Sequence, residues 1–408
     1  MKIKIKISII YLLCVLSCNQ DKKIISNIGT NTNLHVIDID KAEKVERMFL
    51  SEICYQVKTI ILETNDDVLI GNSSYVQVYN DFIFVLDRST NMGLFAFNKE
   101  GAFIRKYGNR GIGPSDYLSI NDFTIDTDND LIYLLDNHVP QILIYQLSTG
   151  KYVNKIRLEE NRSNYSHIQY NNGKLYTDIE YWDFSEENYL IQEIDISTGK
   201  QKQCFLDTKR YNKNWPGRVE RGEESFFYAR NQDACKFVHI CMDTIISIGK
   251  DQIETFAVLR EKDWVTSAGL ARIIDDNRYD PSLIYWKVKE KGFTFDIHNY
   301  AEWKNYIFFR YINDWDKFCV FHNIKTGKTR LVQYLLNDLV HDKTIYQSSF
   351  CCFDEAGLYE IISTRLMDRF IERINTEENF LKKDLDKYEE LMNLPEDSNP
   401  IIFYYKLK

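Results

Sequence analysis

Runs of apolar and aromatic residues alternate with short polar segments from about residue 57 to the end of the chain. Glycine-containing turns separate many of these runs and recur about every 50 residues, at Gly101, Gly150, Gly199 and Gly249. A glycine between two strand-like runs is typical of a hairpin, whose turn needs positive φ angles. A hairpin repeated at this period predicts a repeat architecture of antiparallel sheets.

Each repeat shows the same order of strand-like runs. The first two repeats predict complete four-stranded units over Ser74–Tyr79, Phe82–Asp87, Gly93–Asn98 and Ala102–Tyr107, and over Asp122–Asp126, Leu131–Asp136, Gln141–Leu147 and Tyr152–Leu158. The next three predict strands over Lys174–Tyr181 and Tyr189–Ile196, over Phe237–Met242 and Thr244–Ile248, and over Tyr306–Tyr311, Phe318–Asn323 and Thr329–Tyr334.

The last repeat is one strand short. It offers Ser348–Phe353, Leu358–Thr364 and Ile401–Leu407, whereas Val57–Glu63 precedes the first repeat and is spare. Pairing the spare run with the last repeat closes a ring and leaves no dangling sheet edge. The sequence therefore predicts an all-β, six-bladed β-propeller of four-stranded antiparallel blades, closed by an N-terminal strand.

Two helices interrupt this pattern. A short helix is expected at about 264–275, inside the long gap between Gly249 and the next ladder turn at Gly327. A second is expected at about 365–393, where apolar residues at helical spacing precede Pro395. The first reads as an insertion, and the second is a C-terminal helix.

Composition supports β structure and narrows the partners. Aromatic residues make up 14% of the 408 residues, and only six prolines occur. The formal net charge is −9 and no block of basic residues occurs, which disfavours a nucleic-acid partner.

The N-terminus resembles an export signal. Lys2, Lys4 and Lys6 precede an apolar stretch, Ile7–Leu16, that is too short to span a bilayer, which needs roughly 20 residues. Ser17-Cys18 then resembles a bacterial lipobox, which implies a signal peptide over 1–17, a lipidated Cys18, a flexible polar tether over 18–50, and a propeller over 51–408. The alternative is an ordinary secretory signal that contains a cysteine by chance.

Seven further cysteines follow, and their spacing matches no zinc pattern. We expect mostly buried free thiols, and Cys235–Cys241 is the one disulfide pairing worth testing.

One segment carries a family resemblance. The run from Tyr107 to Tyr117, followed by Phe123–Asp126, Leu131–Asp136 and Ile142–Tyr145, is similar to NHL-type propeller repeats. With the lipobox and the terminal strand, the chain resembles the six-bladed propeller lipoproteins of Bacteroidetes-type bacteria. The resemblance implies this fold and an address in the cell envelope, in the outer membrane. The loop Gly113-Pro114-Ser115-Asp116-Tyr117 departs from the family's usual Gly-Pro-Gly-Glu-Tyr.

The repeat order also assigns loops to faces. The ladder glycines mark turns between third and fourth strands, so we expect the longer loops to share the opposite face, called the long-loop face below. Tryptophan suits sugar stacking or peptide anchoring, and five tryptophans fall in or beside these loops: Trp182, Trp215, Trp264, Trp286 and Trp315. They form either a ligand-contacting cluster or plugs that bury the blade ends. Arg110, Asp116 and Tyr117 either line the same mouth or brace their own loop.

No catalytic constellation stands out. Asp126-Thr127-Asp128-Asn129-Asp130 lacks the glycine and glutamate of a calcium loop and reads as a solvated turn. The seven histidines are scattered, and no metalloprotease, nucleophile-elbow or phosphate-loop motif occurs.

Three functions remain open. The first is a lipid-anchored binding module, without cofactor, for a glycan, peptide or envelope protein on the long-loop face. The second is a lactonase- or lyase-like enzyme with a divalent metal at the channel mouth, which needs three or four convergent ligands. The third is a structural envelope scaffold.

Overall fold

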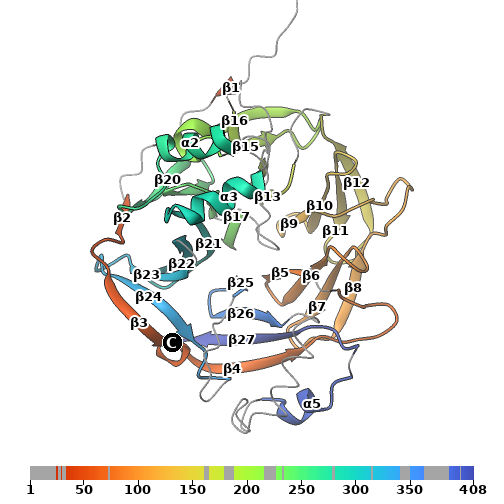
Figure 1. Ribbon diagram of the computed structural model, residues 1–408. Helices are drawn as coiled ribbons and strands as arrows, with labels where there is room; N and C mark the ends of the chain where they lie inside the picture. The colour runs from red at the N-terminus through yellow and green to blue at the C-terminus, as the bar shows by residue number, and fades with distance from the viewer. Residues whose placement is uncertain are drawn as a thin grey trace, which may run out of the picture.

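Six antiparallel sheets surround a central axis in the computed structural model of the chain (Figure 1). The structure describes residues 24–25, 29, 34–71, 74–159, 165–178, 188–215, 227–231, 234–277, 281–313, 316–340, 350–362, 386–395 and 397–408. The sheets follow one another around the ring in chain order, and the first strand of each lies nearest the axis. The predicted six-bladed propeller is confirmed.

The first two blades contain all of their expected strands, and blade three contains its two expected strands with one more on either side. Blade one holds β5 (Ser74–Tyr79), β6 (Phe82–Asp87), β7 (Gly93–Asn98) and β8 (Phe103–Tyr107). Blade two holds β9 (Asp122–Asp126), β10 (Leu131–Asp136), β11 (Gln141–Gln146) and β12 (Tyr152–Arg157). Blade three holds β13 (Ile168–Asn171), β14 (Lys174–Asp178), β15 (Tyr189–Ile194) and β16 (Gln201–Asp207).

The other three blades are completed by strands that the repeat pattern showed only in part. Blade four holds β17 (Phe227–Asn231), β18 (Ala234–Phe237), β19 (Thr244–Gly249) and β20 (Ile253–Arg260). Blade five holds β21 (Thr294–Trp303), β22 (Tyr306–Asn313), β23 (Asp316–Asn323) and β24 (Thr329–Leu336). Blade six holds β25 (Cys352–Phe353), β26 (Gly357–Ile362), β27 (Ile401–Leu407) and β4 (Cys54–Ile61).

The second strand of blade four differs from its prediction. It ends at Phe237, where the expectation placed a strand over Phe237–Met242. Residues 238–242 instead form the connection to β19, with Cys241 in a left-handed conformation. All of Val238, Ile240 and Met242 are nevertheless buried, so their apolar pattern reflects burial of a connection and not a strand.

Burial explains why the middle strands are continuously apolar. In blades one and two, β6, β7, β10 and β11 are buried along almost their whole length, because each blade packs both faces against its neighbours. The outer strand β12 instead leaves Tyr152 and Val153 exposed. The apolar runs in the sequence therefore mark the middle of each blade.

The N-terminal segment runs around the outside of the ring. We call β1 (Ile24–Ile25), β2 (His35–Asp38) and β3 (Glu43–Phe49) the N-terminal belt. Its strands add in parallel to the outer strands β16, β20 and β24 of blades three, four and five. A polar tether was expected over 18–50, but its described part is largely strand. The sequence gives little sign of this because an outermost strand buries few side chains: Ile37 in β2 and Met48 in β3.

The ring closes as the spare run predicted. Strand β4 pairs antiparallel with β27, from Ile61 opposite Ile401 to Cys54 opposite Leu407. Asn399, directly before β27, reinforces the junction from a fully buried position. Its side-chain oxygen accepts a hydrogen bond from the Ile70 N–H at 2.7 Å, and its amide donates to the carbonyls of Glu63 and Val68.

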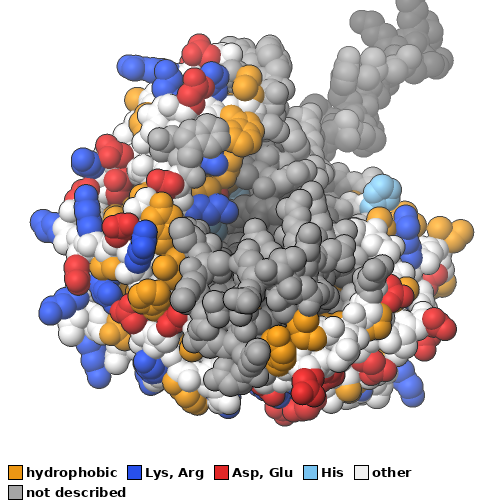
Figure 2. Space-filling model, turned by 60° about the horizontal axis from the view of Figure 1, so that its bottom comes forward, with side chains coloured by type: hydrophobic (Ala, Val, Ile, Leu, Met, Phe, Trp, Pro, Cys, Tyr) orange, Lys and Arg blue, Asp and Glu red, His pale blue; other side chains and the backbone are white. Residues whose placement is uncertain are grey.

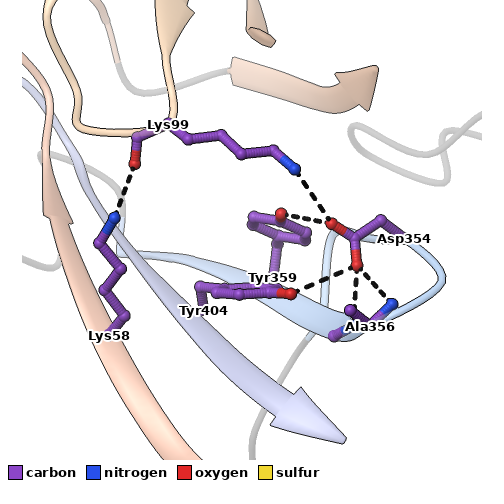
Figure 3. A network of polar contacts seen from close by, with 7 residues as sticks. Lys58, Lys99, Asp354, Ala356, Tyr359 and Tyr404 are labelled. Carbon is purple, nitrogen blue, oxygen red and sulfur yellow. Dashed lines mark hydrogen bonds and ion pairs between the residues drawn. The ribbon is translucent and has the colours of Figure 1, made fainter. Parts of the chain in front are cut away.

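A polar network joins blade six to blade one on the face of the ladder turns (Figure 3). Asp354, in the β25–β26 turn, accepts a hydrogen bond from the Tyr359 hydroxyl at 2.7 Å and pairs with the Lys99 ammonium at 3.7 Å. Lys99 belongs to blade one, and its carbonyl accepts from Lys58 on β4. The rings of Tyr359 and Tyr404 stack with their centroids 4.5 Å apart. This junction therefore combines sheet pairing with a cross-blade ion pair.

The insertion after blade four contains two helices where one was expected. Instead of a single helix at 264–275, the structure has α2 (Ser267–Asn277) and α3 (Pro281–Glu290). Pro281 opens α3, a position where proline's missing N–H costs nothing. Elsewhere the chain forms α1 (Thr208–Tyr211), the 3-10 turn η1 (Leu50–Glu52) and α5 (Tyr388–Met392). Most of the helix expected at 365–393 lies outside the described residues.

Two of the ladder glycines, Gly101 and Gly199, lie where one blade closely touches the previous one. Gly101 has a φ of +94°, and a Cβ there would lie 2.0 Å from the carbonyl oxygen of Ile61 on the closing strand. Gly199 repeats this contact against Arg157 of blade two, at 1.9 Å. Gly249 is different, because it ends β19 without a positive φ. The ladder therefore records close blade-to-blade approach as well as turn geometry.

We predict that Gly101→Ala lowers the free energy of unfolding by roughly 2–5 kcal/mol, since a left-handed alanine costs roughly 1–2 kcal/mol and forced overlap about 1–3 more. Gly327→Ala is the matched control, because Gly327 also has a positive φ but its Cβ would meet nothing within 4 Å. Chemical denaturation of both variants measures the difference. Equal losses would contradict a role for blade contact.

Candidate functional site

The expected tryptophan cluster is only partly in view. Trp182 and Trp315 lie outside the described residues. Trp215 and Trp264 are buried: Trp215 stacks on Phe295, and the Trp264 indole N–H donates to the Cys241 carbonyl at 3.3 Å. Both thus pack within the core beside the α2–α3 insertion. Trp286 on α3 is different, since half of its surface is exposed.

The loop between blades one and two braces itself. Asp116 accepts a hydrogen bond from the Gly113 N–H at 2.9 Å, and the Tyr117 ring is fully buried. Arg110 forms a bridge with Tyr117 through the backbone, while its side chain is exposed. The structure therefore leaves Arg110 and Trp286 as the exposed members of the candidate set among the described residues.

A cavity of about 810 Å³, including space open to solvent, lies among the innermost strands. All six blades line it: β5, β9, β13, β17, β21 and β25 each contribute residues. It is therefore the central channel of the propeller.

The described wall of this channel carries no charged side chain. Its polar groups are amides, hydroxyls, phenols and thiols, set among apolar and aromatic side chains: Tyr75, Gln77, Tyr79, Thr124, Gln169, Tyr228, Asn299, Tyr300, Cys351 and Cys352. Several already bond to the scaffold; the Asn299 amide, for example, donates to the Phe350 carbonyl at 2.9 Å.

The divalent metal of the enzyme hypothesis has no ligand set in this wall. Among the described residues, no carboxylate or imidazole lines the cavity, and no cluster of three or more His, Cys, Asp or Glu is suited to a metal. The aspartate-rich segment after Asp126 forms the β9–β10 turn, as expected, with Asn129 bonded to Asp126.

A second polar group lies beside the channel, near the ends of strands on the long-loop face. Asp178, at the end of β14, accepts hydrogen bonds from the backbone of Ser166 and His167, and its other oxygen lies 2.6 Å from the His167 ring nitrogen Nδ1. Asp87 and Asp136 occupy the same strand end in blades one and two and likewise accept from the incoming interblade loop. The repeated aspartate is therefore a structural device of the blades.

Asp122 makes this part of the molecule unusual. It opens β9, is fully buried, and accepts a hydrogen bond from the Ile168 N–H at 3.0 Å. Burial raises the pKa of Asp122 to about 6, although His167 and Arg88 oppose that effect. Burial alone would lower the pKa of His167, but the Asp178 carboxylate raises it above its ordinary value.

Sequence reasoning missed this cluster. Arg88, Asp122 and His167 come from three different blades, and no motif places them together. The one usable signal was the repeated aspartate at the end of the second strand in blades one, two and three.

The face shown in Figure 2 has no patch of a single charge among the described residues. In Figure 2, acidic and basic side chains are interspersed over the described part of the rim.

All seven cysteines after Cys18 are free thiols, including Cys235 and Cys241, so the disulfide considered between these two is absent. No helix among the described residues is long and apolar enough to cross a bilayer.

Fold and channel define the chain as a six-bladed β-propeller. It belongs to the family described as a domain of unknown function, DUF4934, whose model matches residues 34–406. No curated protein matches the chain.

Solved structures share the fold. A Bacteroides fragilis protein for which export has been suggested superimposes with a TM-score of 0.72 at 15% identity, covering 91% of this chain and 99% of its own. A Bacteroides vulgatus member of the DUF4221 family gives a TM-score of 0.49 at 10% identity, over 87% and 97% of the two chains.

We predict that Asp122→Asn removes a pH dependence of stability between about pH 4 and 6. In this window the folded protein holds a proton on Asp122 that the unfolded chain has lost, so stability falls as the pH rises. The difference between wild type and variant should change across the window by about 2–3 kcal/mol.

Denaturation at several pH values measures that difference. Asp128→Asn, at an exposed site on the turn at the other end of β9, is the control and should keep the wild-type profile. An unchanged profile in Asp122→Asn would show that Asp122 is charged throughout this range.

Proposed function

We propose that the chain is an exported binding module, anchored in the cell envelope by a lipid on Cys18, that binds an uncharged glycan in its central channel. The uncharged wall of the channel, drawn from all six blades, is the observation that carries the proposal. A described wall that carries no carboxylate, imidazole or other charged side chain suits recognition better than hydrolysis.

The wall offers the two kinds of contact that a neutral sugar needs. Amides such as Gln77 and Gln169 supply donors and acceptors for ring hydroxyls, and phenols such as Tyr75 and Tyr79 supply flat apolar area. An anionic sugar or an acidic peptide would find no cation in the described wall. Trp286 and Arg110, both exposed on the long-loop face, extend the proposed contact surface.

We predict that Gln77→Leu weakens glycan binding by about tenfold, since one lost hydrogen bond is worth roughly 0.5–1.5 kcal/mol. Gln77 lines the channel, and leucine keeps its size. The measurement is a glycan-array screen of the purified chain, followed by calorimetry with the strongest neutral and acidic hits. Gln252→Leu, which replaces an exposed glutamine outside the channel, is the matched control.

A second variant separates the channel from the loops. If Trp286→Ala abolishes binding while Gln77→Leu has no effect, the ligand lies on the long-loop face. Preference for acidic glycans, or binding that needs an added divalent metal, would count against an uncharged channel ligand and favour the enzyme hypothesis. Absence of any glycan ligand, together with stable envelope partners, would favour the scaffold.

The address rests on the N-terminus and on one relative. Ser17-Cys18 follows a basic and then an apolar stretch, as in lipoprotein signals. The Bacteroides fragilis protein of the same fold is described in terms of export. The proposed attachment to the outer membrane rests on the resemblance to propeller lipoproteins. One acyl chain alone gives only marginal membrane binding, so stable anchoring requires the several acyl chains of a lipoprotein.

We predict that Cys18→Ser abolishes incorporation of an alkyne-tagged fatty acid and moves the chain from the membrane to the soluble fraction. Lipid attachment needs the Cys18 thiol, which serine does not provide. Cys14→Ser, inside the apolar stretch, is the control and should keep both label and membrane fractionation. Labelling that persists in Cys18→Ser would sink the lipobox interpretation.

A further inference from the structure

Two adjacent thiols line the central channel. Cys352 opens β25, the innermost strand of blade six, and Cys351 directly precedes it. Their sulfur atoms lie 4.0 Å apart. The other five described thiols are buried away from the channel wall. The pair is therefore the one place in the described channel where two soft donor atoms meet.

A disulfide does not fit this pair without backbone movement. Consecutive Cα atoms lie about 3.8 Å apart across a trans peptide, whereas disulfide-bonded residues usually have Cα atoms roughly 4.4–6.8 Å apart. The side chains can instead bind one atom between them.

The sulfur separation suits a shared metal ion. With the metal–sulfur distance of about 2.3 Å that zinc thiolates show, two sulfurs bound to one metal lie about 3.8 Å apart at a tetrahedral angle and at most about 4.6 Å apart in line. The observed 4.0 Å falls between these limits. Because no third His, Cys, Asp or Glu joins the pair among the described residues, the site is incomplete for zinc, which requires four ligands.

We propose that Cys351 and Cys352 form a two-sulfur binding site for Cu(I) in the wall of the central channel. Thiolates favour soft ions of this kind, and an uncharged, partly apolar channel wall offers them no competing oxygen anions. The site is independent of the glycan proposal, since it needs only the two thiols and their spacing.

The ion replaces the hydrogen bond and the protons of the two thiols. Cys351 donates a hydrogen bond to the Tyr359 carbonyl at 3.3 Å. Each sulfur that binds the ion releases its proton to solvent.

The test is a Cu(I) titration of the full-length chain under anaerobic, reducing conditions, in competition with the chromophoric chelator bicinchoninate. We expect one tightly held Cu(I), bound about 100-fold more weakly by the double variant Cys351→Ser, Cys352→Ser. Cys319→Ser, which replaces a buried thiol of blade five, is the matched control and should keep the wild-type affinity.

Peptide mapping on the wild type avoids any effect of the variants on folding. Bound Cu(I) should protect Cys351 and Cys352 from N-ethylmaleimide and leave the labelling of the other cysteines unchanged. Wild-type affinity in the folded double variant, or protection centred on other cysteines, would overturn the proposal.

Discussion

The pairing of β4 with β27 is the constraint on which the rest of the molecule depends. Every blade buries both of its faces against neighbours, so an open ring would expose one face of blade six and one of blade one. Ile60 and Leu62, at the end of the closing strand and just beyond it, join a single core cluster with Phe95 and Phe97 of blade one and Ile402 of blade six. Closure therefore builds a core and also pairs a strand edge.

Closure also explains the distribution of special residues around that junction. Gly101 permits the backbone of blade one to approach Ile61, and buried Asn399 satisfies backbone groups that the turn leaves unpaired. The Lys99–Asp354 pair lies beside them at the surface, where an ion pair is worth little alone but fixes relative position.

Local pattern predicted most of this fold because propeller strands are local hairpins. Apolar runs such as Ile142–Tyr145 and their turns could be read from the sequence, and the spare run at Val57–Glu63 revealed the closure. The belt could not be read, since Ile37 and Met48 are too few buried residues to form a pattern. The second inserted helix, α3, was missed because the prediction assigned a single helix to a segment that contains both α2 and α3.

The composition of the channel wall could not be predicted from the sequence, because it depends on how the six blades are arranged in space. Each blade contributes only a few residues of its first strand, so the uncharged wall appears only when six distant segments meet. The tryptophans show the converse: Trp215 and Trp264 stood out in the sequence, yet their rings pack in the core. Residue type alone does not separate a ring that holds a loop in place from one that meets a ligand.

The N-terminal belt has a mechanical consequence. A pull on the N-terminal end would reach the propeller through β1, then β2, then β3, each held by its own parallel pairing to a different blade. Only after all three had peeled away would the load reach β4 and the closure. The belt thus protects the closure from tension, because its strands detach one after another while β4 and β27 stay paired.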